Sequence, residues 1–494
     1  MSIESSTPRP PYAGVKNSSA RISLPSLRLQ TSERKLLLVS MDLLLINLAL
    51  VGSVLVGWNQ PVTAAMLAAS VKWYVTLSVV WVVVALFFDL YDLARSASTT
   101  NIVRSASLAA VSTALIYSLI PSLTPTLQSR TQIFVFIGLA WLAIVAWRVA
   151  YSLLFIQPHF RQRALVVGAG WAGRTLAETM RVTPHDANPY RGTGYELVGF
   201  IDDNPALGGS TVEGIPVLGG AESLVAMAQT LEINEVIIAV THRHAIDEGL
   251  FDDLLRCQEL GIQLSTMADL YERLLGRVPV QHVGRDLYMA LPSADSAYHR
   301  LYGAVKRLID LLAGLLGLAV LAVVMLPVAA ANRFGSPGPL FYGQERVGLS
   351  GRPFRILKFR TMIPDAEADC GAVWAAEKDH RITRVGQFLR RTRLDELPQV
   401  VNILRGEMSL IGPRPERPEF VEQLAKTIPF YRARHAVRPG LTGWAQVQFR
   451  YGSSVDDARI KLEYDLYYVK NTSTLLDLRI ALQTIPVMLL FQGH

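Results

Sequence analysis

Four apolar segments fill most of the first third of the chain, and they constrain its fold more than any other feature. They span residues 36–58, 71–91, 105–123 and 131–156. Each has about the 20 residues that a helix needs to cross the hydrocarbon core of a bilayer. The third is the weakest, because it is rich in Ser and Ala. We expect residues 36–156 to form a bundle of four transmembrane helices.

The charged residues beside these segments predict how the bundle is oriented. Residues 1–35 are rich in Ser, Pro and Arg and have no apolar signal-peptide core, so we expect a disordered basic tail. Basic residues also lie between the second and third segments and after the fourth: Arg95, Arg104, Arg161 and Arg163. The positive-inside bias therefore places the N-terminus and everything after Phe160 on the cytoplasmic side.

A fifth apolar run, at residues 311–331, has the length of another membrane span. Lys306 and Arg307 precede it and Arg333 follows it, so the charge bias places both of its ends inside. Pro327 lies in its last third, where it removes a backbone donor and gives the helix a place to break. We therefore predict a re-entrant helix-break-helix at residues 308–331, covered by the domain that follows.

The segment at residues 160–290 has the pattern of a Rossmann-like α/β domain. An apolar strand, RALVV, leads into GAGWAG with Gly168, Gly170 and Gly173, and a helix follows. Asp202 ends the next strand, where a ribose-binding acid would stand, although the spacing is longer than usual. Two interpretations stay open: this loop binds NAD(P) or another nucleotide, or its glycines serve only a tight turn and close helix packing.

Two other classes of function are less consistent with the sequence. A membrane-anchored nucleotide-sugar dehydratase or epimerase would use the GxGxxG domain and a Tyr-x-x-x-Lys pair, which Tyr302 and Lys306 supply. That pair leads into the fifth apolar run, outside the α/β domain, which disfavours it. A non-enzymatic membrane scaffold is disfavoured by the many polar motifs that follow.

Composition limits the classes of partner and of metal site that we expect for this protein. The net charge of +7 could indicate nucleic acid, but the basic residues lie beside apolar runs and Gly/Pro turns rather than in one dense tract. We therefore expect no nucleic-acid partner. Cys257 and Cys370 are far apart and have no Cys or His companions, so neither a disulfide framework nor a zinc site is expected.

The C-terminal 301–494 segment carries the densest set of polar motifs. Asp395 and Glu396 are adjacent carboxylates before an apolar helix, and an N-cap role alone would explain Asp395. Arginine and lysine residues recur near them beside Gly and Pro turns, and arginine's planar fork binds phosphate oxygens in pairs. These basic residues are Lys358, Arg360, Arg390, Arg391, Arg393, Arg414 and Arg438. Together they predict an anionic phosphoryl donor as the ligand.

Four of these motifs, in this order, resemble one family. KFRTM, RTRLDELPQ, MSLIGPRPE and RPGLTGWAQV are similar to the bacterial sugar transferases, the monotopic phosphoglycosyl transferases. The resemblance covers residues 302–494, and the four spans with an α/β domain resemble the long members of this family. It implies an α-rich monotopic catalytic domain that transfers hexose 1-phosphate from a UDP-sugar to undecaprenyl phosphate, the first membrane step of exopolysaccharide, capsule or O-antigen synthesis.

The resemblance also implies roles for individual residues. Asp395 would attack the β-phosphorus of the donor in a ping-pong reaction that releases UMP, and Glu396 would hold Mg²⁺ or assist the acceptor. The positions that match family motifs for binding phosphate, nucleotide or sugar are Lys358, Arg360, Arg390, Arg414, Glu416 and Arg438. The implied location is the bacterial inner membrane, with downstream glycosyltransferases as partners. The sequence does not identify the hexose, and it leaves a homodimer open.

Overall fold

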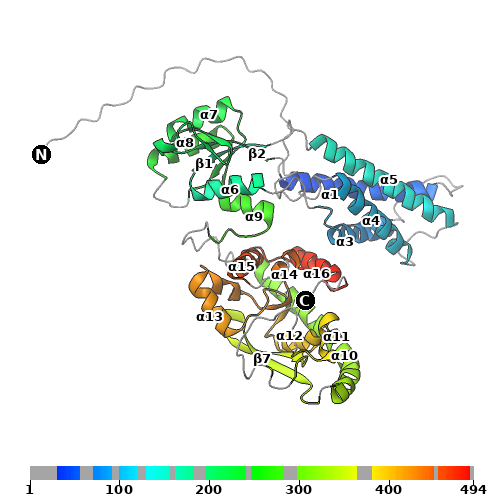
Figure 1. Cartoon of the computed structure of the whole chain (residues 1–494). Coiled ribbons are helices and arrows are strands. Elements are labelled where there is room, and N and C mark those ends of the chain that lie inside the picture. Colours follow the sequence, from blue (N-terminus) through cyan, green and yellow to red (C-terminus); the bar gives the residue numbers. More distant parts are fainter. Residues whose placement is uncertain are drawn as a thin grey trace.

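The computed structural model describes most of the chain in twelve stretches. They are residues 31–55, 71–91, 99–120, 130–155, 162–182, 195–240, 246–281, 297–335, 337–363, 366, 381–449 and 454–489. The predicted tail at residues 1–35 lies almost wholly outside them. Figure 1 shows a helical bundle, an α/β domain and a larger C-terminal domain.

The N-terminal bundle consists of four helices at the predicted segments: α1 (Thr31–Leu55), α3 (Val71–Phe87), α4 (Thr99–Ser118) and α5 (Arg130–Phe155). Alanines of α4 and large side chains of the other helices fill its core, where Trp81, Ala109 and Ile144 are fully buried. Small residues allow helices to approach closely in the absence of water. The bundle's outer face stays apolar, as Leu44, Val75 and Phe134 illustrate.

Three helices of the described chain are long and apolar enough to cross a membrane. The stretches are Glu33–Leu55 in α1, Thr131–Leu153 in α5 and His299–Gly335, while Val71–Phe87 is apolar but shorter. The prediction of four spans is therefore confirmed only in part. Helix α4 is rich in Ser and Ala and does not reach the same mean hydropathy, which is the weakness already visible in the sequence.

The α/β domain is built on a six-stranded sheet of order β3-β4-β2-β1-β5-β6. All neighbours pair in parallel except β3 with β4. The fully buried run at the centre of β1 is typical of a parallel strand covered on both faces. The strands are β1 (Gln162–Val167), β2 (Tyr195–Ile201), β3 (Thr211–Val212), β4 (Ile215–Gly219), β5 (Glu235–Ile238) and β6 (Gln263–Thr266).

Helices connect these strands: α6 (Trp171–Val182), α7 (Leu224–Thr230) and α8 (Glu248–Glu259), and α9 (Met267–Leu275) follows β6. The chain moves outward from β1 through β2 to β4, then returns to add β5 and β6 on the other side of β1. This order places a topological switch point between β1 and β5, the feature that defines a doubly wound fold. The predicted Rossmann-like architecture is present in the described residues.

The C-terminal domain is mostly helical, with two small two-stranded sheets. Its helices are α10 (Ala297–Gly335), α11 (Arg384–Arg391), α12 (Val400–Arg405), α13 (Pro418–Thr427), α14 (Trp444–Gln448), α15 (Val455–Lys470) and α16 (Thr474–Leu489). Strands β7 (Phe341–Val347) and β8 (Pro353–Phe359) form an antiparallel hairpin, and β9 (Ser409–Ile411) pairs in parallel with β10 (Gly440–Thr442). A capping box at Ser454 and Asp457 begins α15.

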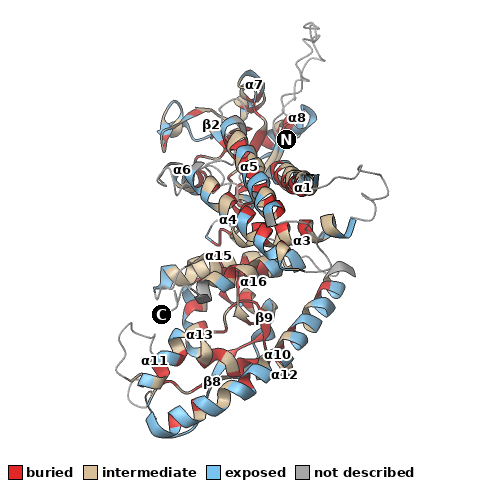
Figure 2. Cartoon of the chain, turned by 90° about the vertical axis from the view of Figure 1, so that its right-hand side faces the viewer, coloured by how far each residue is buried: buried red, intermediate tan, exposed pale blue. Residues whose placement is uncertain are grey.

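Helix α10 corrects one detail of the sequence interpretation. We expected a break at Pro327, but the helix is continuous from Ala297 to Gly335 with Pro327 inside it. A proline removes a single backbone hydrogen bond, and packing on both sides of it can hold the helix together. Leu321 and Val328 provide that packing, because both are buried in a cluster with Phe359. The opposite face of α10 is exposed and apolar (Figure 2).

The α/β domain is joined to the C-terminal domain by more than a linker. Val278 and Val280, which follow α9, lie in the hydrophobic core of the C-terminal domain with Leu424 and Leu466. Trp444 Nε1 also donates to the carbonyl of Gly276, at 2.7 Å. The segment after α9 is therefore part of the C-terminal domain's core.

The membrane bundle also contacts the C-terminal domain. Asp89, at the end of α3, accepts hydrogen bonds from Gln483 and from Arg479 (3.3 Å), both on α16. Arg479 in turn lies over the ring of Trp444, 5.2 Å from its centroid. The end of α3 and helix α16 thus belong to one connected structure.

Candidate active site

The two adjacent carboxylates lie in a short 3₁₀ helix, η8 (Leu394–Gln399), that leads directly into α12. Arg393 precedes it in the left-handed conformation, with φ of 60°, and this turns the chain sharply after α11. Asp395 and Glu396 are both buried, with 8% and 9% of their surfaces exposed. Their side chains point in different directions because neighbours on a 3₁₀ helix differ by about 120°.

Glu396 is held by two cations. Its Oε1 accepts a hydrogen bond from Lys358 Nζ at 2.8 Å and another from Arg414 Nη2 at 2.7 Å. Lys358 comes from β8 and Arg414 from the loop after β9, so the contact joins three separate segments. Burial alone would raise the pKa of Glu396, but the charges of Arg414 and Lys358 and their hydrogen bonds hold it well below its ordinary value. Glu396 is therefore ionised at neutral pH.

Asp395 lies in a different environment. Its Oδ1 is buried and accepts no hydrogen bond from any residue that the structure describes. Burial and the negative charge of Glu396 raise the pKa of Asp395, and Lys358, Arg390 and Arg414 oppose that rise. A carboxylate oxygen without a partner beside several positive charges has the chemistry of a nucleophile for an anionic substrate. The N-cap explanation does not hold, because Arg393 and not Asp395 occupies the cap of η8.

Two further predicted phosphate ligands lie near this pair and also serve the fold. Arg390, in the last turn of α11, donates from Nε to Thr361 Oγ1 at 3.0 Å. Arg360 donates to the carbonyls of Pro339 and Met362 and, at 2.9 Å, to Asn332 Oδ1. The guanidinium of Arg360 thus joins the end of α10 to β8, and a phosphate contact for it stays a prediction.

The remaining two predicted ligands lie on the loops around Arg414. Glu416 is 3.6 Å from Arg346 Nη1 through its Oε2. Arg438 donates from Nε to the carbonyl of Gly406, at 3.1 Å. Roles for Glu416 and Arg438 in binding substrate stay predictions.

In the glycine-rich loop of the α/β domain, the predicted residues are engaged with one another. Gly168 has φ of +102°, and a Cβ on Gly173 would lie 2.1 Å from the carbonyl oxygen of Gly168. Asp202 Oδ2 accepts from the amide of Ala169 at 2.7 Å. The geometry of the turn is therefore enough to account for the residue types at Gly168, Gly173 and Asp202. It does not account for Gly170, because nothing lies within 4 Å of a Cβ at that position. NAD(P) or another nucleotide at this loop stays a prediction.

The Tyr-x-x-x-Lys pair of the dehydratase alternative lies far from that loop in the fold. Tyr302 and Lys306 are on α10, and both donate to Asp477 Oδ2 at 2.9 Å. Tyr468 donates to the other oxygen of Asp477 at 2.8 Å. The pair thus joins α10 to α15 and α16, and the dehydratase alternative is not favoured.

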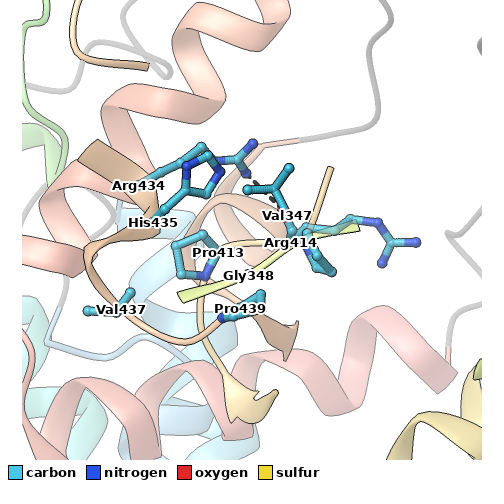
Figure 3. Close-up of a pocket in the computed structure, with 9 residues that line it drawn as sticks. Val347, Gly348, Pro413, Arg414, Arg434, His435, Val437 and Pro439 are labelled. Atoms are coloured by element: carbon cyan, nitrogen blue, oxygen red, sulfur yellow. Dashed lines mark hydrogen bonds between the residues drawn. The ribbon is translucent and has the colours of Figure 1, made fainter. Parts of the chain in front are cut away.

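A buried ion pair beneath the site was not predicted from the sequence. Arg434 and Asp465 are 5% and 2% exposed, and Arg434 Nη2 lies 2.7 Å from Asp465 Oδ2. Arg434 Nη2 also donates to the carbonyl of Arg414, at 2.9 Å (Figure 3). Arg434 lies outside the four motifs, and in YRARHAV it stands beside Arg432 and His435, so nothing in the segment distinguishes it as the buried arginine.

Comparison with known proteins identifies the C-terminal domain. Residues 301–491 match the family described as bacterial sugar transferase. Residues 86–245 match a family described as CoA-binding domain. The first match contains the carboxylate pair and all four motifs, and the second overlaps the end of α3, helices α4 and α5, and strands β1 to β5.

Three relatives illustrate the similarity. UDP-N-acetylgalactosamine-undecaprenyl-phosphate N-acetylgalactosaminephosphotransferase of Aeromonas hydrophila is 44% identical over 48% of this chain and 54% of its own length. UDP-glucose:undecaprenyl-phosphate glucose-1-phosphate transferase of Escherichia coli (strain K12) is 32% identical over 69% of this chain and 74% of its own. Undecaprenyl-phosphate glucose phosphotransferase of Komagataeibacter xylinus is 42% identical over 70% and 64%.

These matches differ in extent. The chain spans about half the length of the Aeromonas hydrophila relative and about three quarters of the Escherichia coli one. The latter match extends beyond the C-terminal domain, since it covers 368 residues. The chain belongs to the bacterial sugar transferase family, the family of these undecaprenyl-phosphate sugar phosphotransferases.

Proposed function

We propose that this protein transfers a hexose 1-phosphate from a UDP-sugar to undecaprenyl phosphate and so begins the synthesis of a surface polysaccharide. The observation that carries the proposal is the buried Asp395, whose Oδ1 has no hydrogen-bond partner in the described chain, beside Glu396 with its two cations. The relatives' names supply the acceptor and the two donor types, glucose and N-acetylgalactosamine.

The reaction proceeds in two steps in this proposal. An oxygen of Asp395 attacks the β-phosphorus of the donor, the bond from that phosphorus to the bridging oxygen breaks, and UMP leaves with the electron pair. The acyl phosphate that results carries the sugar. A phosphate oxygen of undecaprenyl phosphate then attacks the same phosphorus, and the carboxylate of Asp395 is restored as the leaving group. The products are UMP and undecaprenyl-diphosphate-sugar.

The surrounding residues stabilise the charge that develops in these steps. Lys358 and Arg414 already converge on Glu396, and their remaining N–H groups can bind oxygens of the donor diphosphate. Arg390 contributes a further positive charge near Asp395. Because the dyad is buried, these charges act in a medium of low dielectric and are worth more than at the surface.

The dyad fits a magnesium ion that is bound partly by the substrate. No group of three or more His, Cys, Asp or Glu residues forms a metal site in the described residues. Mg²⁺, however, is commonly held by one or two carboxylates together with substrate phosphates. Lys358 and Arg414 both bind Oε1 of Glu396, so Oε2 is the oxygen that would hold Mg²⁺. When bound, the ion would neutralise charge on the diphosphate.

The proposal includes a location on the cytoplasmic face of the inner membrane, where a UDP-sugar is available. Helix α10 supports a location of the whole catalytic domain on one side of the membrane, because it contacts the same domain along its length. Tyr302 bonds Asp477 near its start, a Cβ on Gly314 would contact Leu404, and one on Gly335 would contact Val385. A helix that crossed the bilayer could not contact one domain at both ends. We propose that α10 lies in one leaflet with its apolar face toward lipid.

An intact-mass experiment tests the function. The full-length protein in detergent or lipid nanodiscs is mixed with UDP-glucose or UDP-N-acetylgalactosamine and Mg²⁺, without acceptor, and quenched. We expect the protein to gain the mass of one phosphosugar on the peptide that contains Asp395, and to lose it when undecaprenyl phosphate is added. Turnover without this adduct at any quench time would contradict the two-step route and favour direct transfer.

A further inference from the structure

The loop that carries Arg414 is fixed in an unusual way. Four consecutive carbonyl groups accept a hydrogen bond each: Pro413 from the Gly440 amide (2.9 Å), Arg414 from Arg434 Nη2 (2.9 Å), Pro415 from Arg346 Nη1 (3.1 Å) and Glu416 from the Val347 amide (2.9 Å). The donors come from β10, from the 3₁₀ helix η9 (Tyr431–Ala436) and from β7. Every carbonyl from Pro413 to Glu416 is therefore held.

The sequence of this loop explains why its carbonyls are used. Pro413 and Pro415 lack backbone N–H groups, and their rings fix φ. The loop can therefore be held mainly through its acceptors. At Arg414 and Pro415 the donors are arginine side chains, which can reach carbonyls that no neighbouring strand approaches.

Arg434 is itself held rigidly. Its Nη1 donates to the Tyr431 hydroxyl at 2.8 Å, its Nη2 donates to Asp465 at 2.7 Å, and its guanidinium lies 5.2 Å from the Tyr431 ring centroid. Figure 3 shows Arg434 beside the Arg414 backbone, while the Arg414 guanidinium extends away from the prolines. That guanidinium is the one that bonds Glu396 at 2.7 Å. A chain of contacts thus connects Asp465, Arg434, Arg414 and Glu396.

We propose that Arg434 is a positioning residue: it holds the main chain of Arg414 so that the Arg414 guanidinium meets Glu396 and the donor diphosphate. Arg346 performs the same task one residue later, at Pro415. Neither side chain bonds Asp395 or Glu396 in the described structure, so each acts through the loop. This inference deepens the proposed function and rests on it.

Lysine can replace the charge of Arg434 but not its geometry. Arg434→Lys keeps a positive charge for the buried Asp465, yet one ammonium group cannot reach Asp465, Tyr431 and the Arg414 carbonyl in the same planar arrangement. Removal of the charge would instead leave Asp465 buried and uncompensated, which is strongly destabilising. The matched control is Arg432→Lys, because Arg432 is exposed on the same 3₁₀ helix.

The experiment compares wild type, Arg434→Lys, Arg414→Lys, the double variant and Arg432→Lys as full-length proteins in nanodiscs. For each we measure the thermal midpoint, the affinity for UDP, and kcat and KM for sugar-phosphate transfer. We expect Arg434→Lys to lose at least about tenfold in kcat/KM and to bind UDP more weakly, at a thermal midpoint near that of wild type, because the Arg414 guanidinium no longer meets Glu396 and the donor diphosphate. The double variant should lose no more than the worse single variant. Arg432→Lys should behave as wild type.

Two outcomes overturn the inference: Arg434→Lys with the kcat/KM and UDP affinity of wild type, or losses that multiply in the double variant. If Arg434→Lys does not fold, Arg346→Lys is put through the same comparison and decides in the same way. UDP affinity separates this inference from the proposed function. Wild type that binds UDP but transfers no sugar would reject the function, while weaker UDP binding in both single variants would still support Arg434 as the residue that positions Arg414.

Discussion

Arg414 Nη2 donates to Glu396 Oε1 at 2.7 Å, and this bond joins the 3₁₀ helix η8 to the loop after β9. Glu396 lies between α11 and α12, whereas Arg414 follows β9. Lys358 approaches the same oxygen from β8. The two carboxylates therefore lie in different environments. Glu396 is paired with two cations, whereas Oδ1 of Asp395 accepts no hydrogen bond from the described residues.

Replacement of Asp395 by asparagine should abolish both the covalent adduct and turnover. An amide oxygen carries no charge and is a poor nucleophile for phosphorus, so overall activity should fall by several orders of magnitude. Glu396→Gln is the comparison variant. It should also lower turnover, but excess Mg²⁺ should restore part of it, because a weakened metal site responds to mass action. Intact mass and a radiolabelled transfer assay measure both effects, and an adduct on Glu396 would reverse the two roles.

The site should show an acid limb set by Asp395. Burial and Glu396 raise the pKa of Asp395, and attack needs its ionised form, so kcat/KM should fall as pH drops through that raised value. Lys358 opposes the rise, so Lys358→Met should move the acid limb upward by about one pH unit or more. Lys426→Met, an exposed lysine on α13, is the control. An acid limb that stays in place in Lys358→Met would show that Lys358 does not act on Asp395.

A truncated catalytic domain should need the segment that follows α9. Val278 and Val280 are 1% and 2% exposed within the core of the C-terminal domain. A chain that starts at Gly276 should therefore unfold at a higher temperature than one that starts at Asp295. In the full-length protein, Val278→Ala should cost about 2 kcal/mol through lost burial and a cavity. Equal thermal midpoints for the two truncations would show that the segment is dispensable.

The two ends of α10 should be accessible from the same side of the membrane. Phe334, near its C-terminal end, is 89% exposed, and Leu119, after α4, is 80% exposed. In a background with Cys257 and Cys370 replaced, Phe334→Cys should react with an impermeant thiol reagent only from the cytoplasmic side. Leu119→Cys serves as the control that reacts from outside. Reaction of Phe334→Cys from outside would mean that α10 crosses the bilayer.

The glycine-rich loop offers a paired test of structure against ligand binding. Gly173→Ala places a Cβ 2.1 Å from the Gly168 carbonyl oxygen, so it should destabilise the α/β domain by about 3 kcal/mol. Gly170→Ala meets nothing within 4 Å and should change stability by less than about 0.5 kcal/mol. Thermal unfolding with and without NAD(P) or CoA measures both. Stabilisation of wild type by one of these ligands that is lost in Gly170→Ala would show binding at this loop.

Sequence periodicity and motif order were enough to predict the helices of the bundle, the doubly wound sheet and the family of this protein. The four apolar segments are helices, the parallel strands around GAGWAG form a doubly wound sheet, and the motifs around Asp395 identify the family. These features are local, because hydrophobic length, strand patterning and contiguous motifs do not depend on distant parts of the chain. Lys358 and Arg414 were also predicted as site residues from the sequence, and both donate hydrogen bonds to Glu396.

The tertiary structure alone decided how those parts are connected. No local pattern indicated that Arg434 and Asp465 would form a buried pair behind Arg414, that Val278 would lie in another domain's core, or that Asp89 would meet α16. Pro327 likewise predicted a break in α10, but the helix is continuous because Leu321 and Val328 pack on either side of the proline. The physical reason is common to all four: each depends on contacts between segments distant in sequence, and their energies are set by burial and geometry that only the folded chain creates.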